Sequence, residues 1–280
     1  MFSILIPTWN NLAYLKFCIE SIRKNSASDH QIIVHVNDGS DGTIEYLKAE
    51  GVDFTQSDTN IGICFGVNSA THLAQKDYIV YMNDDMYVCP NWDVPLMEEI
   101  KSLNHDLFMF SGTLIEPNDT QNKCVIVADY GKDLATFRAA DLDQNYKTHQ
   151  HFDWNGSAWP PTIVSKRMWT YVGGYSTELS PGMSSDDDFA MKMWQAGCRL
   201  FKGMGDSRIY HFQAKSTHRI VKNDGRRQFL QKWNLNQSTF NKYFLKRGTP
   251  FVGPLTAPDT AILKKEQLRA RLKIIFKNIK

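Results

Sequence analysis

The first hundred residues alternate between short apolar runs, which are typical of buried strands, and stretches with a helical repeat. The runs lie at residues 4–6, 32–36 and 78–82, with a weaker one at 52–55. Between them, apolar residues recur at steps of three and four, as on one helix face: Leu12, Leu15, Ile19 and Ile22, then Ile63, Val67, Ala70 and Ala74. Strands that alternate with helices build βαβ units. The pattern therefore predicts an α/β fold with a mostly parallel sheet and helices on both faces.

Composition allows a folded core and limits the partners. Of the 280 residues, 42% are hydrophobic and 22% are charged, close to average globular usage, so disorder is not expected. The net charge of +2 argues against a protein whose whole surface binds nucleic acid. Five cysteines, an odd number without a CxxC pair, indicate reduced thiols rather than a disulfide or zinc framework.

Neither a leader nor a membrane span is visible in the sequence. The chain opens directly on an apolar strand, and no apolar run reaches the roughly 20 residues that cross a bilayer. We therefore expect a cytoplasmic protein. Beyond residue 108 the pattern is less regular, although helices are expected over 165–172, from Asp186 to Gly197 and over 225–247.

The last segment, residues 262–280, differs from the rest in charge. It holds seven basic residues and one acidic residue, so it carries +6 and the preceding 261 residues carry 2 − 6 = −4. Its apolar residues share one helical face: Leu268, Leu272, Ile275 and Ile279. Two interpretations stay open: a basic amphipathic helix on an anionic membrane surface, or a charged helix packed on its own domain or a partner subunit.

Polar clusters follow three predicted strands, after residues 6, 36 and 82. Ligands of parallel sheets bind at the carboxyl ends of strands, so these clusters should converge on one crevice. Asn83-Asp84-Asp85 places two carboxylates after a buried strand, where a cation, water or a donor must meet them. Hard cations such as Mg²⁺ or Mn²⁺ favour oxygen ligands and are often held by one or two carboxylates together with substrate phosphates. The cluster therefore predicts a metal site that binds a nucleoside diphosphate. An acidic turn that caps the next helix is the alternative.

Two further acidic clusters have more than one interpretation. In residues 37–43, a carboxylate could accept the ring N–H of a uracil or guanine; alternatively Ser40 or Asp41 caps the following helix, and the residues alone favour such a turn. Asp186-Asp187-Asp188 opens a predicted helix, where capping needs one or two acids but hardly three. One of these carboxylates could act as a general base to a hydroxyl.

A histidine could be a further ligand of the metal. His211 follows a strand-like run, and a lone histidine is more often structural than a ligand. His149, His151 and His218 are the other candidates, and the sequence does not separate them.

Several motifs occur in a definite order: Ile4-Leu5-Ile6-Pro7-Thr8-Trp9-Asn10, Val36-Asn37-Asp38-Gly39-Ser40-Asp41-Gly42-Thr43, Asn60-Ile61-Gly62 with Asn68, Asn83-Asp84-Asp85, Gly173-Gly174-Tyr175, Ser185-Asp186-Asp187-Asp188-Phe189 and Ala196-Gly197. In this order and spacing, the chain resembles the inverting glycosyltransferases of family 2 over about residues 2 to 212. That family has the GT-A fold, an α/β fold with a Rossmann-like sheet.

The resemblance implies a role for each matching position. Nucleotide-sugar binding would fall to Pro7, Thr8, Asn10, Asp38, Asn60, Gly62, Asn68, Asn83 and Asp84. Asp38 would bind the base, most often uracil in this family, which favours a UDP-sugar. Asp85 would be the main ligand of a divalent cation, Mn²⁺ or Mg²⁺, with His211 as a late histidine ligand. Asp186 would be the catalytic base, and Asp188 matches the second acid of that motif.

The sequence departs from the family pattern at three positions. Ser185 replaces the acid before the base, which leaves Asp186 and its neighbours open as the base. Asn83 replaces the first acid of the DxD-type motif, and Val67 stands where many members have an arginine. Another cation would then meet the diphosphate charge; the candidates are Lys166, Arg167 and Lys215.

The resemblance predicts an inverting transferase that moves a sugar from a nucleoside-diphosphate sugar to a hydroxyl of a glycan or lipid-linked acceptor, in cell-surface glycan or polysaccharide biosynthesis. Loop aromatics Trp154 and Trp159 could stack on sugar rings, although core packing is equally compatible, as for Trp169. A nucleotidyltransferase is an alternative, but no Gly-rich loop bearing Lys or Arg follows the first strand. A non-catalytic nucleotide-sugar-binding module is the other.

The expected organisation is a GT-A catalytic domain over 1–215, a helical extension over 216–261 and the basic amphipathic helix over 262–280. Within the catalytic domain, residues 1–110 would bind the nucleotide sugar and residues 111–215 the acceptor. A peripheral position on the inner face of the membrane would follow if residues 262–280 contact lipid. Nucleic acid is not expected as a partner.

Overall fold

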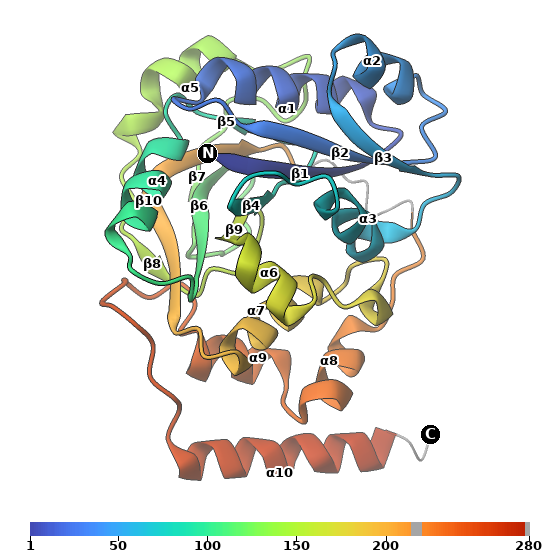
Figure 1. Cartoon of the computed structure of the whole chain (residues 1–280). Coiled ribbons are helices and arrows are strands. Elements are labelled where there is room, and N and C mark those ends of the chain that lie inside the picture. Colours follow the sequence, from blue (N-terminus) through green and yellow to red (C-terminus); the bar gives the residue numbers. More distant parts are fainter. Residues whose placement is uncertain (214–219, 278–280) are drawn as a thin grey trace.

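The computed structural model describes residues 1–213 and 220–277 (Figure 1). One ten-stranded sheet runs through the molecule in the order β3-β2-β1-β4-β9-β6-β10-β5, with β7 beside β6 and β8 beside β10. The strands are β1 (Phe2–Trp9), β2 (Gln31–Asn37), β3 (Asp53–Ser57), β4 (Tyr78–Tyr81), β5 (Met86–Val88), β6 (Phe108–Glu116), β7 (Val125–Val127), β8 (Trp154–Asn155), β9 (Thr162–Ser165) and β10 (Leu200–His211).

The first half of the chain forms the predicted parallel unit. Strands β3, β2, β1 and β4 are parallel neighbours, and Ile4 of β1 pairs with Ile32 of β2 and Val80 of β4. The helices between them are α1 (Leu12–Asn25), α2 (Thr43–Ala49) and α3 (Gly62–Thr71). Figure 1 shows α1 and α2 on one face of these strands and α3 on the other.

Alternation along β1 explains why both faces are covered. Successive side chains of a strand point to opposite faces, so Ile4 and Ile6 share a core cluster with residues of α1, whereas Leu5 packs with Cys64 and Val67 of α3. The expected α/β architecture, with a mostly parallel sheet between two helical layers, is confirmed.

The second half is a mixed sheet. Strand β9 lies antiparallel between β4 and β6, β10 runs parallel to β6, and β5 pairs antiparallel with β10. The helices here are α4 (Asp93–Ser102), α5 (Ala139–Asn145), α6 (Lys166–Val172) and α7 (Ser185–Gln195). The last two confirm the helices expected over 165–172 and from Asp186. Helix α6 stops at Gly173, which takes a left-handed φ of 74°.

The helix expected over residues 225–247 is wrong in its extent. Helix α8 (Gly225–Trp233) ends at Asn234, which adopts a left-handed φ of 48°. Helix α9 (Gln237–Thr239) follows, and a π-helical turn (Phe240–Phe244) continues it. Phe229, Phe240 and Phe244 pack into the same core cluster as residues of α7. The apolar residues of this segment repeat at helical spacing, but the chain must turn between α8 and α9 for all of them to pack against α7.

Helix α10 (Thr260–Lys277) runs along the outside of the molecule beside α8 and α9 (Figure 1). In the described part of the chain, no helix has the length and apolar character needed to cross a membrane. All five cysteines are buried and unpaired. Lys215, His218 and Ile279, which the sequence singled out, lie outside the described residues.

Candidate functional site

Three strand ends meet at one edge of the sheet, as the parallel arrangement requires. Strand β1 lies between β2 and β4, so its carboxyl end reaches the polar clusters that follow both neighbours. Thr8 Oγ1 donates a hydrogen bond of 2.7 Å to Asp84 Oδ2. Asn10 Nδ2 donates to Asp38 Oδ2 at 2.9 Å. Segments separated by tens of residues in sequence therefore bring two carboxylates to the end of β1.

The turn after β2 gives its two aspartates different tasks. Asp38 adopts a left-handed φ of 68° and is partly exposed, with Asn10 as its partner. Asp41 instead accepts hydrogen bonds from the backbone N–H groups of Thr43 and Leu12. Asp41 thus accepts hydrogen bonds at the starts of α1 and α2, as the turn interpretation expected. Asp38 instead contacts Asn10 at the end of β1.

Asp85, His211 and Glu116 form a buried polar group beside Asp84. His211 ends β10 and pairs in register with Met86, which places its ring Nε2 3.5 Å from Asp85 Oδ1. Its Nδ1 lies 2.9 Å from Glu116 Oε1 at the end of β6. Burial lowers the pKa of His211, but the carboxylates of Asp85 and Glu116 outweigh burial and raise that pKa to about 10.

These side chains suit a divalent cation. Among the described residues, no three His, Cys, Asp or Glu side chains are already grouped as a metal cage. Mg²⁺ and Mn²⁺, however, take one or two protein carboxylates and complete their shell with water and substrate phosphates. A metal-ligating histidine typically donates its other N–H to a carboxylate, which is the relation between His211 Nδ1 and Glu116. A cation would have to displace the Nε2 proton of His211, after which Asp85 and His211 are the residues that would hold it.

The other described histidines lie elsewhere. His149 Nε2 contacts the hydroxyl of Tyr130 at 2.7 Å, and His151 contacts the backbone carbonyl oxygens of Phe152 and Lys123. Of the described candidates, His211 is the one in contact with Asp85.

Asp186 lies in the first turn of α7 and is partly buried. The hydroxyl of Tyr175 donates a hydrogen bond of 3.0 Å to its Oδ1. The Tyr175 ring packs edge-on against Tyr81 at 5.5 Å between centroids, and the Tyr81 hydroxyl donates to Asn83 Oδ1 at 3.0 Å. Two tyrosines therefore connect Asp186 to the acidic strand end of Asp84 and Asp85.

The surroundings of Asp186 change its acidity. Burial raises the pKa of the Asp186 carboxyl to about 7, although the hydrogen bond from Tyr175 acts in the opposite direction. A carboxylate with a pKa near the working pH can accept a proton efficiently and is still ionised in part. Perturbed acids of this kind are frequent at functional sites.

The two neighbours of Asp186 face the C-terminal part of the chain. Asp187 is 2% exposed and accepts hydrogen bonds from Gln237 and Arg247, and the Arg247 guanidinium also covers the Trp159 ring. Consecutive helical residues are turned by about 100°, so adjacent carboxylates point in different directions. The triplet thus presents Asp186 to Tyr175 and Asp187 to the segment after α9.

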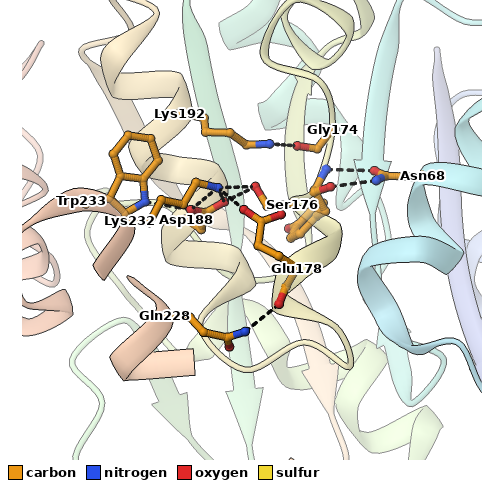
Figure 2. Close-up of polar contacts among 10 residues, drawn as sticks. Asn68, Gly174, Ser176, Glu178, Asp188, Lys192, Gln228, Lys232 and Trp233 are labelled. Carbon is orange, nitrogen blue, oxygen red and sulfur yellow. Dashed lines mark hydrogen bonds and ion pairs between the residues drawn. The ribbon is translucent and has the colours of Figure 1, made fainter. Parts of the chain in front are cut away.

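Asp188 is fully buried and joins α7 to α8. Its Oδ1 accepts from Trp233 Nε1 at 2.7 Å and lies 3.0 Å from Lys232 Nζ. Figure 2 shows Lys232 reaching Asp188, Ser176 and Glu178 together. The second acid of the motif therefore makes structural contacts in this protein.

Asn68 and Gly62 join α3 to the segment of residues 175–181. Asn68 donates to the Tyr175 carbonyl oxygen and accepts from the Tyr175 N–H, both at 2.8 Å. Gly62 has a φ of 80°, and a Cβ there would lie 2.4 Å from Ser180 Oγ and 2.6 Å from Pro181 Cα. Both residues, expected at the nucleotide sugar, hold α3 against the loop that carries Tyr175.

The remaining predicted residues lie around the same strand ends. Pro7 is a partly buried residue within β1, and Asn60 accepts a hydrogen bond from the Gly62 N–H at 2.9 Å. Asn83 is partly buried beside Tyr81. Their roles toward a nucleotide sugar stay predictions.

The expectation that Lys166 or Arg167 meets the diphosphate is wrong, and for two of the tryptophans the structure decides between the open alternatives. Ser165 pairs with Tyr78 at the start of β4, so Lys166 and Arg167 lie at the opposite end of that strand from Asp84. Lys166 donates to the Ala74 carbonyl oxygen, and Arg167 pairs with Asp106. The antiparallel direction of β9 beside β4 has no signal in the sequence. Among the tryptophans, Trp154 and Trp169 are 2% and 4% exposed, so they pack in the interior.

Sequence reasoning did not assign roles to Glu116, Tyr81 or Tyr175. Glu116 ends a strand in which every residue is buried, and a lone acid at such a strand end was the available signal. Tyr175 belongs to the Gly173-Gly174-Tyr175 motif, but nothing in that motif indicates that its hydroxyl meets a carboxylate eleven residues later.

Comparison with known proteins gives a family match and a set of relatives. Residues 3–158, more than half of the chain, match Glycosyl transferase family 2. An uncharacterized glycosyltransferase of Haemophilus influenzae is 23% identical over 199 residues, which cover 70% of this chain and 62% of that protein. The chain therefore spans less than two thirds of this relative.

Solved structures of S. aureus TarS are similar in fold. The structure of TarS 1-349 gives a TM-score of 0.57 at 14% identity, over 82% of this chain and 64% of that one. Its complex with UDP-GlcNAc gives 0.53 at 16% identity, over 76% and 60%. At such identities the likeness concerns the fold alone, and it confirms the expected GT-A fold.

Proposed function

The chain belongs to glycosyl transferase family 2, and on this premise we propose that it moves a sugar from a UDP-sugar to a hydroxyl acceptor with inversion at the anomeric carbon. The observation that carries the proposal is Asp186, a partly buried carboxylate with a pKa of about 7, tied by two tyrosines to the strand ends that would hold the diphosphate. The similar TarS structures include complexes with UDP and UDP-GlcNAc, which supports UDP as the nucleotide.

In the proposed reaction, Asp186 accepts the proton of the acceptor hydroxyl as its oxygen attacks the anomeric carbon. The bond from that carbon to the diphosphate oxygen breaks on the opposite face, and UDP leaves with the electron pair. One displacement of this kind inverts the centre and forms no covalent sugar–enzyme intermediate. Asp187 and Asp188 are engaged with Arg247, Lys232 and Trp233, which supports Asp186 rather than its neighbours as the base.

The nucleotide would lie across the strand ends. Asp38 and Asn10 are the proposed partners of the uracil, and Thr8 and Asp84 are those of the ribose and diphosphate. Asp85 and His211 would hold Mn²⁺ or Mg²⁺, with Glu116 orienting the histidine. When bound, such a cation neutralises the charge that develops on the leaving diphosphate.

Substitution of Tyr175 by phenylalanine is expected to shift the pH dependence of turnover. The Tyr175 hydroxyl lowers the pKa of Asp186, so its loss should raise that pKa and move the acidic limb of the kcat/KM profile upward by about one pH unit. Wild-type turnover should fall as the pH drops through about 7, because a protonated base cannot accept a proton.

The profile is measured as UDP release between pH 5.5 and 9. Tyr171→Phe is the matched control, because Tyr171 is 75% exposed on α6. Superimposable profiles for Tyr175→Phe and wild type would show that the Asp186 carboxyl does not set the acidic limb.

Chelation is expected to stop UDP release, and added Mn²⁺ or Mg²⁺ should restore it. The Asp85→Asn variant should respond weakly to either ion at concentrations that saturate the wild type, because it lacks the main proposed ligand. The test compares UDP release in EDTA with release during a metal titration. Full turnover in EDTA would end the metal proposal while leaving Asp186 untouched.

A panel of nucleotide sugars tests the choice of donor. We expect UDP-sugars to raise the thermal midpoint more than GDP-, CDP- or dTDP-sugars, and to be turned over slowly to UDP by water. A nucleotidyltransferase would form a new nucleotide–sugar bond instead, and a binding module would stabilise without turnover. The acceptor proposed is a glycan or lipid-linked saccharide of the cell surface, met on the cytoplasmic side.

A further inference from the structure

Helix α10 contacts the body of the protein through one face only. Ala270 is fully buried, and Leu263 packs on the core cluster that contains Phe229 and Phe240. Glu266 accepts a hydrogen bond from Thr239 at 3.2 Å. The half-buried or buried positions of the helix are residues 263, 266, 267, 270 and 274, and at helical spacing these lie on one face.

The opposite face of α10 carries four exposed apolar side chains. Leu268, Leu272, Ile275 and Phe276 are 59%, 43%, 54% and 66% exposed. At about 100° per residue, these four positions centre on the side of the helix directly away from Ala270. We refer to them as the outer stripe. The sequence had left open a charged helix packed on its own domain, and α10 does pack there through Ala270 and Leu263, whereas Leu268, Leu272 and Ile275 face away from the domain.

Basic side chains border the outer stripe. Lys264 and Arg271 lie along one edge, Arg269 lies along the other, and Lys265 lies within it; all four are exposed. The one acid of the segment, Glu266, is turned inward to Thr239 and Arg269. Residues 262–280 carry +6 against −4 for the remainder, so this segment of the sequence is the source of the net positive charge.

We propose that α10 docks the protein on an anionic membrane surface, with the outer stripe inserted at the boundary between headgroups and acyl chains. An interfacial helix needs an apolar stripe bordered by Lys and Arg, and anionic lipids attract such residues. A second copy of the chain is a poorer occupant, because two segments of +6 would face one another. Docking would also hold the proposed transfer site close to lipid-linked acceptors.

The test is flotation of the full chain with vesicles of phosphatidylcholine alone or mixed with phosphatidylglycerol. We expect binding to the mixed vesicles, weaker binding in high salt, and little binding to phosphatidylcholine alone. The triple variant Leu268→Ser, Leu272→Ser and Ile275→Ser should lose about ten- to a hundredfold in vesicle affinity. Its UDP release in solution should not change, because the three side chains contact neither the core nor the strand ends.

The matched control replaces three exposed apolar residues elsewhere, Phe152→Ser, Val221→Ser and Val252→Ser, and should bind vesicles like the wild type. Equal binding of wild type and the α10 triple variant would overturn the proposal. So would a wild-type dimer in solution that this variant abolishes, since the outer stripe would then be an interface between copies. Vesicle binding is scored without turnover, so it can fail while the proposed transferase activity stands.

Discussion

Asp186→Asn is expected to lower UDP release by about a hundred- to ten-thousandfold, the usual contribution of general base catalysis. Asparagine keeps the size of the side chain and can still accept the Tyr175 hydrogen bond, but it cannot take a proton. The affinity for UDP should stay within a few-fold of wild type, because the proposed partners of UDP are Asp38, Asn10, Thr8 and Asp84 rather than Asp186. Turnover is measured as UDP release, and affinity is measured by calorimetric titration of UDP.

The control is Asp29→Asn, the same substitution at an exposed aspartate in the loop after α1, which should have no effect on turnover. A second readout separates loss of the base from misfolding. The folded-state pKa of Asp186 is raised, so ionisation destabilises the native protein as the pH rises through about 7. Asp186→Asn should therefore melt at a higher temperature than wild type at pH 8, with a smaller difference at pH 5.5. Turnover close to wild type in this variant would remove Asp186 as the base.

Among the substitutions considered, Arg247→Ala is expected to lower the free energy of unfolding most, by about 3–5 kcal/mol. The substitution leaves the Asp187 carboxylate, 3% exposed, without its ion-pair partner, and it uncovers Trp159. It should also loosen the contact between the first turn of α7 and the segment after α9. Unfolding by urea at fixed pH measures the change.

Two further variants give this expectation its control. Arg269→Ala breaks an ion pair in which the arginine is 57% exposed, and it should cost at most about 1 kcal/mol. The double variant Asp187→Leu and Arg247→Met removes both charges and should recover part of the loss, because no buried charge is left alone. A loss for Arg247→Ala no larger than that for Arg269→Ala would show that the Asp187–Arg247 pair is not an anchor.

The parts of the site that follow from local sequence pattern could be predicted from the sequence alone. The apolar runs and helical repeats predicted βαβ units, and parallel strands place their carboxyl ends along one edge. That reasoning correctly brought Asp38 and Asp84 to the end of β1. Spacing and residue type also marked Asp186 as the start of a helix.

The other features of the site and of α10 depend on contacts between residues far apart in the sequence, so they could not be predicted. The different tasks of Asp186, Asp187 and Asp188 are set by Tyr175, Arg247 and Lys232, whose positions a local pattern does not reveal. Lys166 and Arg167 were assigned to the wrong end of the sheet because the antiparallel insertion of β9 has no sequence signal of its own. On α10 the repeat identified an apolar face, but only its packing determined that this face points outward.

Chemical rescue of Asp186→Asn by azide tests the central claim most directly. Azide is already an anion and needs no base, so it can attack the anomeric carbon as the bond to UDP breaks. We predict that azide restores UDP release in Asp186→Asn and yields a β-glycosyl azide from an α-linked UDP-sugar. Absence of rescue in a variant that still binds UDP, or a glycosyl azide with the configuration of the donor, would contradict Asp186 as the base of an inverting transfer.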